Sequence, residues 1–292
     1  MLLPQLLFNG IAAGCLYSLV ALGFGMIYNT TRIFHFAHGA IYTVCVYLLY
    51  FVAIKIGLPI WISVAVALVS TSLLGLVLEV GLYHPFNRRG ASLLVMMIVS
   101  LALYIILVNL VALFFGNETK VLNPGIAKTY SLGSVILSQI QVIQILVFIF
   151  LFFGFVLLLK LTNLGKIIRA LRDNPDLVIA LGVNVKNVRQ IVFALGSFLA
   201  GVSAILLGLD VGIDPHIGLS ALLAGVVAVI IGGVGIFEGA ALGGLSLGIL
   251  QSLVIWQASA RWQEAVTFGI LILFLVFKPE GLLGQKKRLE EL

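Results

Sequence analysis

Two histidines, His35 and His38, stand three residues apart in the stretch TRIFHFAHGAIY, after 31 residues that contain no Asp, Glu, Lys or Arg. On a helix this spacing brings two side chains to one face, as two ligands of one metal ion would require. A zinc site, however, uses three or four protein ligands. No carboxylate or cysteine lies between Arg32 and Cys45, so we expect no metal at these histidines.

Catalysis by a histidine would require a nucleophile or a carboxylate held beside the ring. The chain has only 11 acidic residues and supplies little evidence of such a partner, so we expect no catalytic residue. We expect a structural joint instead, at which His38 bonds backbone groups that are freed where a helix begins or breaks. The alternative, that His38 only satisfies local packing, stays open.

The polar segment at residues 163–190 contains the start and stop signals of two short helices. Asn174 can cap a helix, Pro175 suits its first position, and Gly182 can supply a left-handed stop. These signals predict helices at about 165–173 and 175–181.

The second of these helices is too short to be stable alone in water. Leu177, Val178 and Leu181 would form its apolar face, so it must dock on its own bundle or on a partner. A solvated basic loop held by lipid headgroups is the alternative; we favour a docking surface.

Glycines recur at four-residue spacing in the stretch GGVGIFEGAALGG, at Gly235, Gly239 and Gly243. This spacing lets helix backbones approach closely in lipid, so we predict helix packing here. Glu238 within the stretch is costly in hydrocarbon and should lie at a turn or face water.

The elements that position these residues must be membrane-spanning helices. The chain of 292 residues is 62% hydrophobic and only 10% charged, with a mean hydropathy of +1.21, which leaves too little polar surface for a soluble globule. Runs without Asp, Glu, Lys or Arg cover residues 1–31, 36–54, 56–78, 90–117, 129–159, 190–209, 215–237, 239–260 and 265–277. Most are long enough to cross a bilayer. The sequence therefore predicts an all-α polytopic transmembrane bundle of about eight or nine helices, as one membrane domain over residues 1–292.

The net charge of +6 is distributed in a way that indicates membrane topology and not nucleic-acid binding. Twelve of the 17 Lys and Arg residues fall in three segments, 88–89, 160–189 and 278–288. An even number of crossings separates these segments, so all three can lie on the cytoplasmic side, as the positive-inside rule requires. The C-terminus is then cytoplasmic. No phosphate-binding P-loop pattern occurs, so any ATP would be hydrolysed by another chain.

Five segments in order resemble the permease subunits of branched-chain amino acid ABC importers. Phe36-Ala37-His38-Gly39 is similar to the family's Asn-Phe-Ala-His-Gly signature, and GGVGIFEGAALGG and KPEGLLG resemble two later motifs. The remaining similarities are Tyr83, Pro85 and Arg88 with Glu79, and then Gly165, Arg169, Ala170, Ala180 and Gly182 in the cytoplasmic loop. His35, Leu222, Ile236 and Glu238 depart from the usual family residues.

The resemblance implies a heteromeric ABC importer that moves branched-chain or related small amino acids into the cytoplasm. This chain would pair with a second homologous permease, two ATP-binding subunits and an extracytoplasmic substrate-binding protein in a bacterial or archaeal cytoplasmic membrane. It would bind no cofactor itself, since ATP and magnesium would be used by the partner subunits. The substrate pathway would include Phe36, His38 and Gly39, and the residues coupled to the ATPase would be Arg169, Ala170, Asn174 and Gly182.

Other functions stay open on the sequence. A permease of the same family that carries urea or short amides would share most of this pattern. An ion-coupled carrier should show ionisable residues in mid-span, whereas Glu79 lies near a predicted helix end and Asp210 and Asp214 lie in a short loop. A passive channel would need no docking loop, and a membrane scaffold would explain neither the ordered motifs nor the glycines.

Overall fold

The computed structural model of the chain describes residues 2–122, 128–132, 135–257 and 262–284. Its helices are α1 (Leu2–Thr31), α2 (Ala37–Tyr50), α3 (Ile60–Leu78), α4 (His84–Arg88), α5 (Leu93–Phe115), α6 (Gln139–Leu161), α7 (Asn163–Asp173), α8 (Pro175–Ala180), α9 (Val185–Val211), α10 (Ile217–Gly232), α11 (Phe237–Gln257) and α12 (Gln263–Phe277). The π-helical turns η1 (Phe51–Lys55) and η2 (Glu79–Tyr83) extend α2 and α3.

Seven helical stretches in the described part of the chain are long and apolar enough to cross a membrane. They contain α1, α2, α3, α5, α6, α9 and α11, and the apolar helices α10 and α12 are shorter. The outer helices expose large apolar side chains such as Leu73, Leu113 and Phe150, which lipid can cover because each backbone polar group is bonded within its helix. A polytopic helical bundle is therefore confirmed, and the nine apolar helices agree with the predicted eight or nine.

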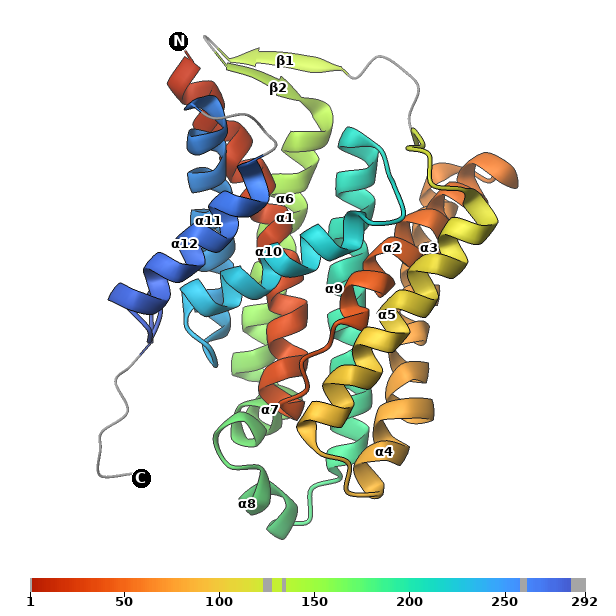
Figure 1. Ribbon diagram of the computed structural model, residues 1–292, viewed down its shortest axis with the longest axis vertical. Coiled ribbons are helices and arrows are strands. Elements are labelled where there is room, and N and C mark those ends of the chain that lie inside the picture. Colours follow the sequence, from red (N-terminus) through yellow and green to blue (C-terminus); the bar gives the residue numbers. More distant parts are fainter. Residues whose placement is uncertain (1, 123–127, 133–134, 258–261, 285–292) are drawn as a thin grey trace.

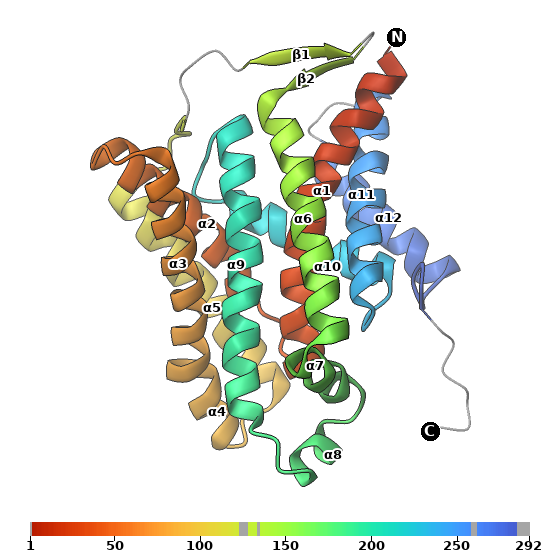
Figure 2. The same cartoon turned by 180° about the vertical axis from the view of Figure 1, so that it is seen from behind.

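Helix α1 runs through the middle of the bundle and contacts α6, α9, α10 and α11. Helix α9 also packs on α2 and α3, and α2 packs on α5, so α2, α3 and α5 form one side of the molecule (Figures 1 and 2). The contact between α1 and α11 is backbone to backbone, since a Cβ at Gly14 would lie 2.8 Å from the Cα of Leu245. Small residues thus allow the close helix packing that lipid favours.

The prediction that the charge-free run at 129–159 is one spanning helix is wrong at its beginning. The helix α6 begins only at Gln139. Strands β1 (Thr129–Leu132) and β2 (Val135–Ser138) form an antiparallel hairpin, with Thr129 opposite Ser138. Ser138 then caps α6, because its Oγ accepts from the backbone N of Gln141 at 3.1 Å and the Gln141 side chain bonds back. This capping box fixes the start of the helix at Gln139.

The two ends of the bundle differ in character. The hairpin lies at the end where α1 begins, while α4, α7 and α8 lie at the opposite end (Figure 1). The turn between α10 and α11 belongs to that second end, because the Arg172 Nη1 on α7 donates to the Gly235 carbonyl at 2.7 Å. The segment after α12 lies beside this turn, because the Leu282 N–H donates to the Ile231 carbonyl, near the end of α10, at 2.7 Å. The described parts of all three basic segments therefore gather at one end.

Candidate functional site

Helices α7 and α8 begin and end close to where their sequence signals predict. Asn174 Oδ1 accepts from the backbone N of Leu177 at 3.0 Å, which caps α8. Gly182 follows with φ +76°, a left-handed conformation that suits glycine. Thr162, one residue before α7, caps it in the same way through Gly165 N at 3.0 Å. The segment therefore consists of two capped helices rather than a loose basic loop.

Helix α8 presents apolar side chains both to the bundle and away from it. Val178 is 3% exposed, whereas Leu177, Ile179 and Leu181 at the end of the helix are 56%, 59% and 73% exposed. The helix lies at the extreme end of the molecule, beyond the spanning helices (Figures 1 and 2). Val178 thus anchors α8 to the bundle, while the other three apolar side chains are largely uncovered.

Helix α7 joins this end of the molecule to the α1–α2 junction and to the α10–α11 turn. Ile168 and Leu171 are buried, at 0% and 1% exposure, and Arg169 and Ala170 lie on the more accessible faces. Besides the bond from Arg172 to Gly235, Arg32 Nη2 donates to the Arg172 carbonyl at 2.9 Å. Displacement of α7 would therefore pull on two other connections of the bundle.

Arg32 holds an unusual backbone conformation at this connection. Its φ is +59°, the only positive φ of a non-glycine residue among those the structure describes. Such a conformation is uncommon for a residue with a Cβ and persists where surrounding contacts determine it. The bond to α7 is one such contact, so the turn after α1 and the end of α7 position each other.

Glu79 and Arg189 form a buried ion pair that the sequence analysis did not anticipate. Arg189 Nε lies 2.7 Å from Glu79 Oε1 and Nη2 lies 3.2 Å from Oε2, the two-point geometry that guanidinium favours. The Arg189 side chain is 9% exposed and the Glu79 side chain is 0% exposed. Glu79 opens the π-helical turn η2, and Arg189 lies near the start of α9. The pair therefore fixes the start of α9 to η2, the extension of α3.

A sequence signal for this pair exists. Glu79 is the first acidic residue of the chain, and the next is Glu118. A lone acid next to an apolar span requires a partner, and Arg189 directly precedes another span. Which base pairs with it depends on how α3 and α9 pack, so the sequence alone could not identify the partner.

The two histidines lie at the start of α2 and are both fully buried. His35 Nδ1 is 2.8 Å from the Tyr83 hydroxyl and 3.4 Å from Ser100 Oγ. Its Nε2 and both ring nitrogens of His38 have no hydrogen-bond partner among the described residues. The freed backbone N–H of Ala37 donates to Ser100 Oγ at 3.0 Å, so Ser100 rather than His38 bonds this amide.

The expected pathway residues Phe36, His38 and Gly39 all lie at the start of α2, but they face different neighbours. Phe36 is half-buried and packs on Phe34, with ring centroids 4.7 Å apart. His38 is inside the bundle, and a Cβ on Gly39 would lie 2.7 Å from the Gly218 carbonyl of α10. The structure brings these three residues together at the α1–α2 junction and places Arg169, Ala170, Asn174 and Gly182 at the separate α7–α8 connection.

The glycine series divides into two packing faces and one turn. A Cβ at Gly239 or Gly243 would collide with the backbone of α10 at Gly232 or Ala228, and Gly244 and Gly248 meet α1 in the same way. Gly235 instead lies before α11 with φ +99°, so its requirement for glycine is conformational and not close packing. Glu238 is in the first turn of α11, partly exposed and 3.6 Å from Lys160 Nζ, as its charge requires.

No three His, Cys, Asp or Glu side chains come close enough to hold a metal ion within the ranges that the structure describes. The α7–α8 end therefore combines a short exposed helix, two arginine hydrogen bonds that join α7 to the α1–α2 junction and the α10–α11 turn, and a buried ion pair at the start of α9.

Comparison with known proteins agrees with this picture over most of the chain. A family model described as branched-chain amino acid transport system / permease component matches residues 6–275. The chain is 32% identical to the high-affinity branched-chain amino acid transport system permease protein BraD of Pseudomonas aeruginosa, over 96% of this chain and 95% of that protein. It is 30% identical to the corresponding permease LivH of Salmonella typhimurium, with the same two coverages. It is 25% identical to the probable permease LivM of Methanocaldococcus jannaschii, over 75% of this chain and 68% of that protein. No solved structure matches the chain.

Proposed function

The chain belongs to the permease family of branched-chain amino acid transport systems, a family of membrane-spanning transport subunits and not of enzymes, and we propose that it imports branched-chain amino acids. It is a multi-pass permease subunit of an ABC importer that assembles with other transport subunits. The comparisons favour this function over a urea or amide permease and over an ion-coupled carrier. The cargo is proposed from the names of the relatives.

One observation supports the ATP-driven mechanism more than any other: the three exposed apolar side chains of α8. Leu177, Ile179 and Leu181 project beyond the spanning helices next to charged residues such as Asp173 and Asp176. In our proposal they fill an apolar groove on a separate ATP-binding subunit, while Arg169, Ala170, Asn174 and Gly182 shape the connection that fits it. Two such subunits would bind ATP and magnesium, and this chain would bind neither.

Closure of the ATPases would move α7 and α8 as one piece. The bond that Arg32 donates to the Arg172 carbonyl and the bond that Arg172 donates to the Gly235 carbonyl would pass this movement to the α1–α2 junction and the α10–α11 turn. Phe36, His38 and Gly39 would then form a moving part of the substrate pathway wall at that junction. The Glu79–Arg189 pair would keep α9 fixed to η2 during the movement.

The remaining partners and the orientation follow from the two different ends. The end with the basic residues is cytoplasmic in our proposal, in agreement with the positive-inside rule, so the C-terminus is cytoplasmic too. The hairpin end would face an extracytoplasmic substrate-binding protein. A second, homologous permease would complete the pathway, which the similarity of this chain to both LivH-named and LivM-named relatives supports. The membrane would be a bacterial or archaeal cytoplasmic membrane.

Affinity purification from the native membrane in mild detergent tests the docking proposal. We expect ATPase subunits to co-purify with the unmodified chain and to be lost from an Ile179→Asp variant, because a carboxylate in an apolar groove is costly. Ile136→Asp is the matched control, since Ile136 is similarly exposed, 62% against 59%, but lies in the hairpin at the opposite end. Equal ATPase recovery with both variants would contradict docking through α8.

Uptake into liposomes tests the transport reaction itself. The complex with its binding protein should accumulate leucine only when ATP is supplied. ATP-driven uptake of urea instead of leucine would support an ABC importer but contradict the proposed substrate. A chain that purifies alone and moves solute without ATP would overturn the importer proposal.

A further inference from the structure

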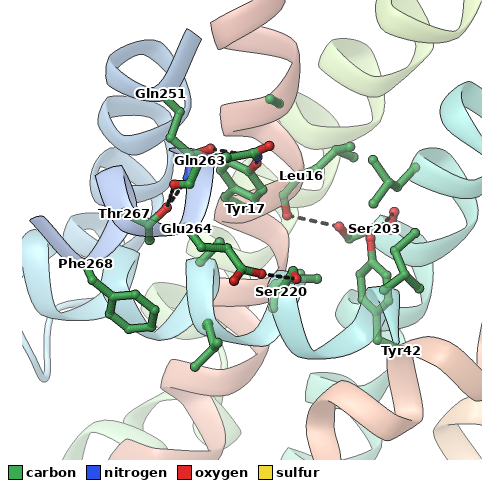
Figure 3. A pocket seen from close by; sticks show the side chains of 17 residues that line it. Leu16, Tyr17, Tyr42, Ser203, Ser220, Gln251, Gln263, Glu264, Thr267 and Phe268 are labelled. Carbon is green, nitrogen blue, oxygen red and sulfur yellow. Dashed lines mark hydrogen bonds between the residues drawn. The ribbon is translucent and has the colours of Figure 1, made fainter. Parts of the chain in front are cut away.

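A cavity of about 200 Å³ lies where α1, α2, α9, α10, α11 and α12 meet (Figure 3). Its volume is below the range of sites for drug-sized ligands, so it suits a small molecule. Its walls combine apolar side chains, among them Leu16, Val20 and Phe268, with polar groups from all six of these helices. Neither the sequence motifs nor the comparisons assign it a role.

Most polar groups at this cavity are occupied with one another. Gln263 Nε2 donates to the Tyr17 hydroxyl at 3.0 Å and to Gln251 Oε1 at 3.3 Å. The Gln251 side chain in turn donates to the Thr267 hydroxyl, and Thr267 Oγ1 donates to the Gln263 carbonyl at 2.8 Å. This ring joins α1, α11 and α12 in the way that polar side chains join helices in lipid, so packing explains it.

Glu264 lines the same cavity but takes no part in this ring of hydrogen bonds. Its side chain is exposed, and its Oε1 accepts one hydrogen bond, from Ser220 Oγ of α10 at 2.9 Å. Figure 3 shows Glu264 and Ser220 pointing toward each other across the opening. An ionised carboxylate has room for further donors, and Oε2 accepts none from the described residues.

The position of Glu264 makes this free capacity significant. Glu264 lies in the first turn of α12, directly after Gln263 of the polar ring, and lines the same cavity. Its one hydrogen-bond partner among the described residues is Ser220. The carboxylate is therefore available to a cationic group that enters the cavity.

We propose that this cavity is a transit site for the transported amino acid, in which the Glu264 carboxylate and the Ser220 hydroxyl bind its ammonium group and the apolar wall holds its aliphatic side chain. Among the residues that the structure describes, none that lines the cavity is a Lys, Arg or His. The amino acid's own carboxylate would therefore point out of the mouth into water. This inference rests on the proposed import function and adds a discrimination to it: an ammonium-bearing cargo is favoured over a neutral amide.

Protection of an introduced cysteine tests the site directly. In the assembled complex, an Ala13→Cys variant, which places the thiol on a partly exposed lining residue of α1 and keeps both Ser220 and Glu264, is labelled with a small methanethiosulfonate reagent, with and without leucine. The native cysteines Cys15 and Cys45 are buried, at 2% and 0% exposure, and give little background. Ala265→Cys is the matched control, because it is an exposed neighbour on α12 that does not line the cavity.

We expect leucine to slow labelling of the Ala13→Cys variant and not of the Ala265→Cys variant. Adding Glu264→Gln should raise the leucine concentration for half-protection roughly ten- to hundredfold, as loss of a charged hydrogen bond would, and Glu264→Asp should restore part of it. Isocaproamide, which lacks the ammonium group, should protect poorly. Equal protection by the amide, or no protection by leucine in a complex that imports leucine with ATP, would overturn the transit site and leave the import function intact. A complex that imports no leucine at all would refute the proposed function first.

Discussion

Two buried polar clusters lie next to each other in this bundle, and they differ in charge and in how fully their polar atoms are hydrogen-bonded. At one end of η2, Glu79 is ionically paired with Arg189 in a two-point contact. At the other end, Tyr83 contacts His35, and beyond it His38 has no hydrogen-bond partner among the described residues. The first cluster is charged and satisfied, and the second consists of groups that can be neutral and is only partly satisfied.

The difference shows what an apolar interior permits. An unpaired charge would cost several kcal/mol in such surroundings, so a charge is found only with its partner. Burying a neutral imidazole costs less free energy than burying an unpaired charge. Its unbonded nitrogen can form a hydrogen bond if the helices around it move. The paired cluster is therefore suited to holding α3 and α9 together, and the histidine cluster to the junction that we propose to move.

Removal of one charge from the pair should have the largest effect. Arg189→Ala leaves the Glu79 carboxylate buried without its partner, so we expect a loss of about 3–5 kcal/mol in the free energy of unfolding. Denaturant unfolding of the detergent-solubilised protein measures it. A double variant, Glu79→Leu with Arg189→Leu, is the control, because replacing both charges with apolar groups is often neutral or stabilising. A small loss in Arg189→Ala would mean that the pair does not fix α9.

An intermediate effect is expected where the clusters meet. Tyr83→Phe removes the hydroxyl 2.8 Å from His35 Nδ1 and leaves a buried nitrogen with only the longer Ser100 contact. The cost should be about 1–3 kcal/mol, measured by the same unfolding experiment. Tyr104→Phe is the comparison, since Tyr104 is also buried and no described side chain hydrogen-bonds its hydroxyl. If both substitutions cost the same, the His35 contact contributes nothing specific.

The smallest effect on stability is expected at His38, together with a loss of transport. His38→Met conserves volume and removes two unpartnered nitrogens, so the free energy of unfolding should change by less than about 1.5 kcal/mol. ATP-driven uptake by the reconstituted complex should nevertheless fall if the junction forms part of the pathway wall. Unchanged uptake would assign His38 to packing alone and remove it from the proposed pathway.

Much of the fold could be predicted from the sequence, because it depends on local composition. Long apolar runs must become helices in lipid, since no water is present to bond a free backbone group. The caps of α7 and α8 were likewise readable, because Asn174 and Gly182 act on their immediate neighbours. The start of α6 does not follow from composition alone. The capping box of Ser138 and Gln141 sets it within a run that carries no charge and so shows no break.

The sequence by itself therefore determined the membrane environment, the family and the short helices of the 163–190 segment, all of which follow from neighbouring residues. Only the tertiary structure decided which distant groups meet: Glu79 with Arg189, Arg32 with the end of α7, and Glu264 with Ser220 at a cavity. These pairs join residues 44 to 140 positions apart. Their contacts depend on how apolar helices rotate and tilt against one another, and helices that are apolar on every side carry little local information about that choice.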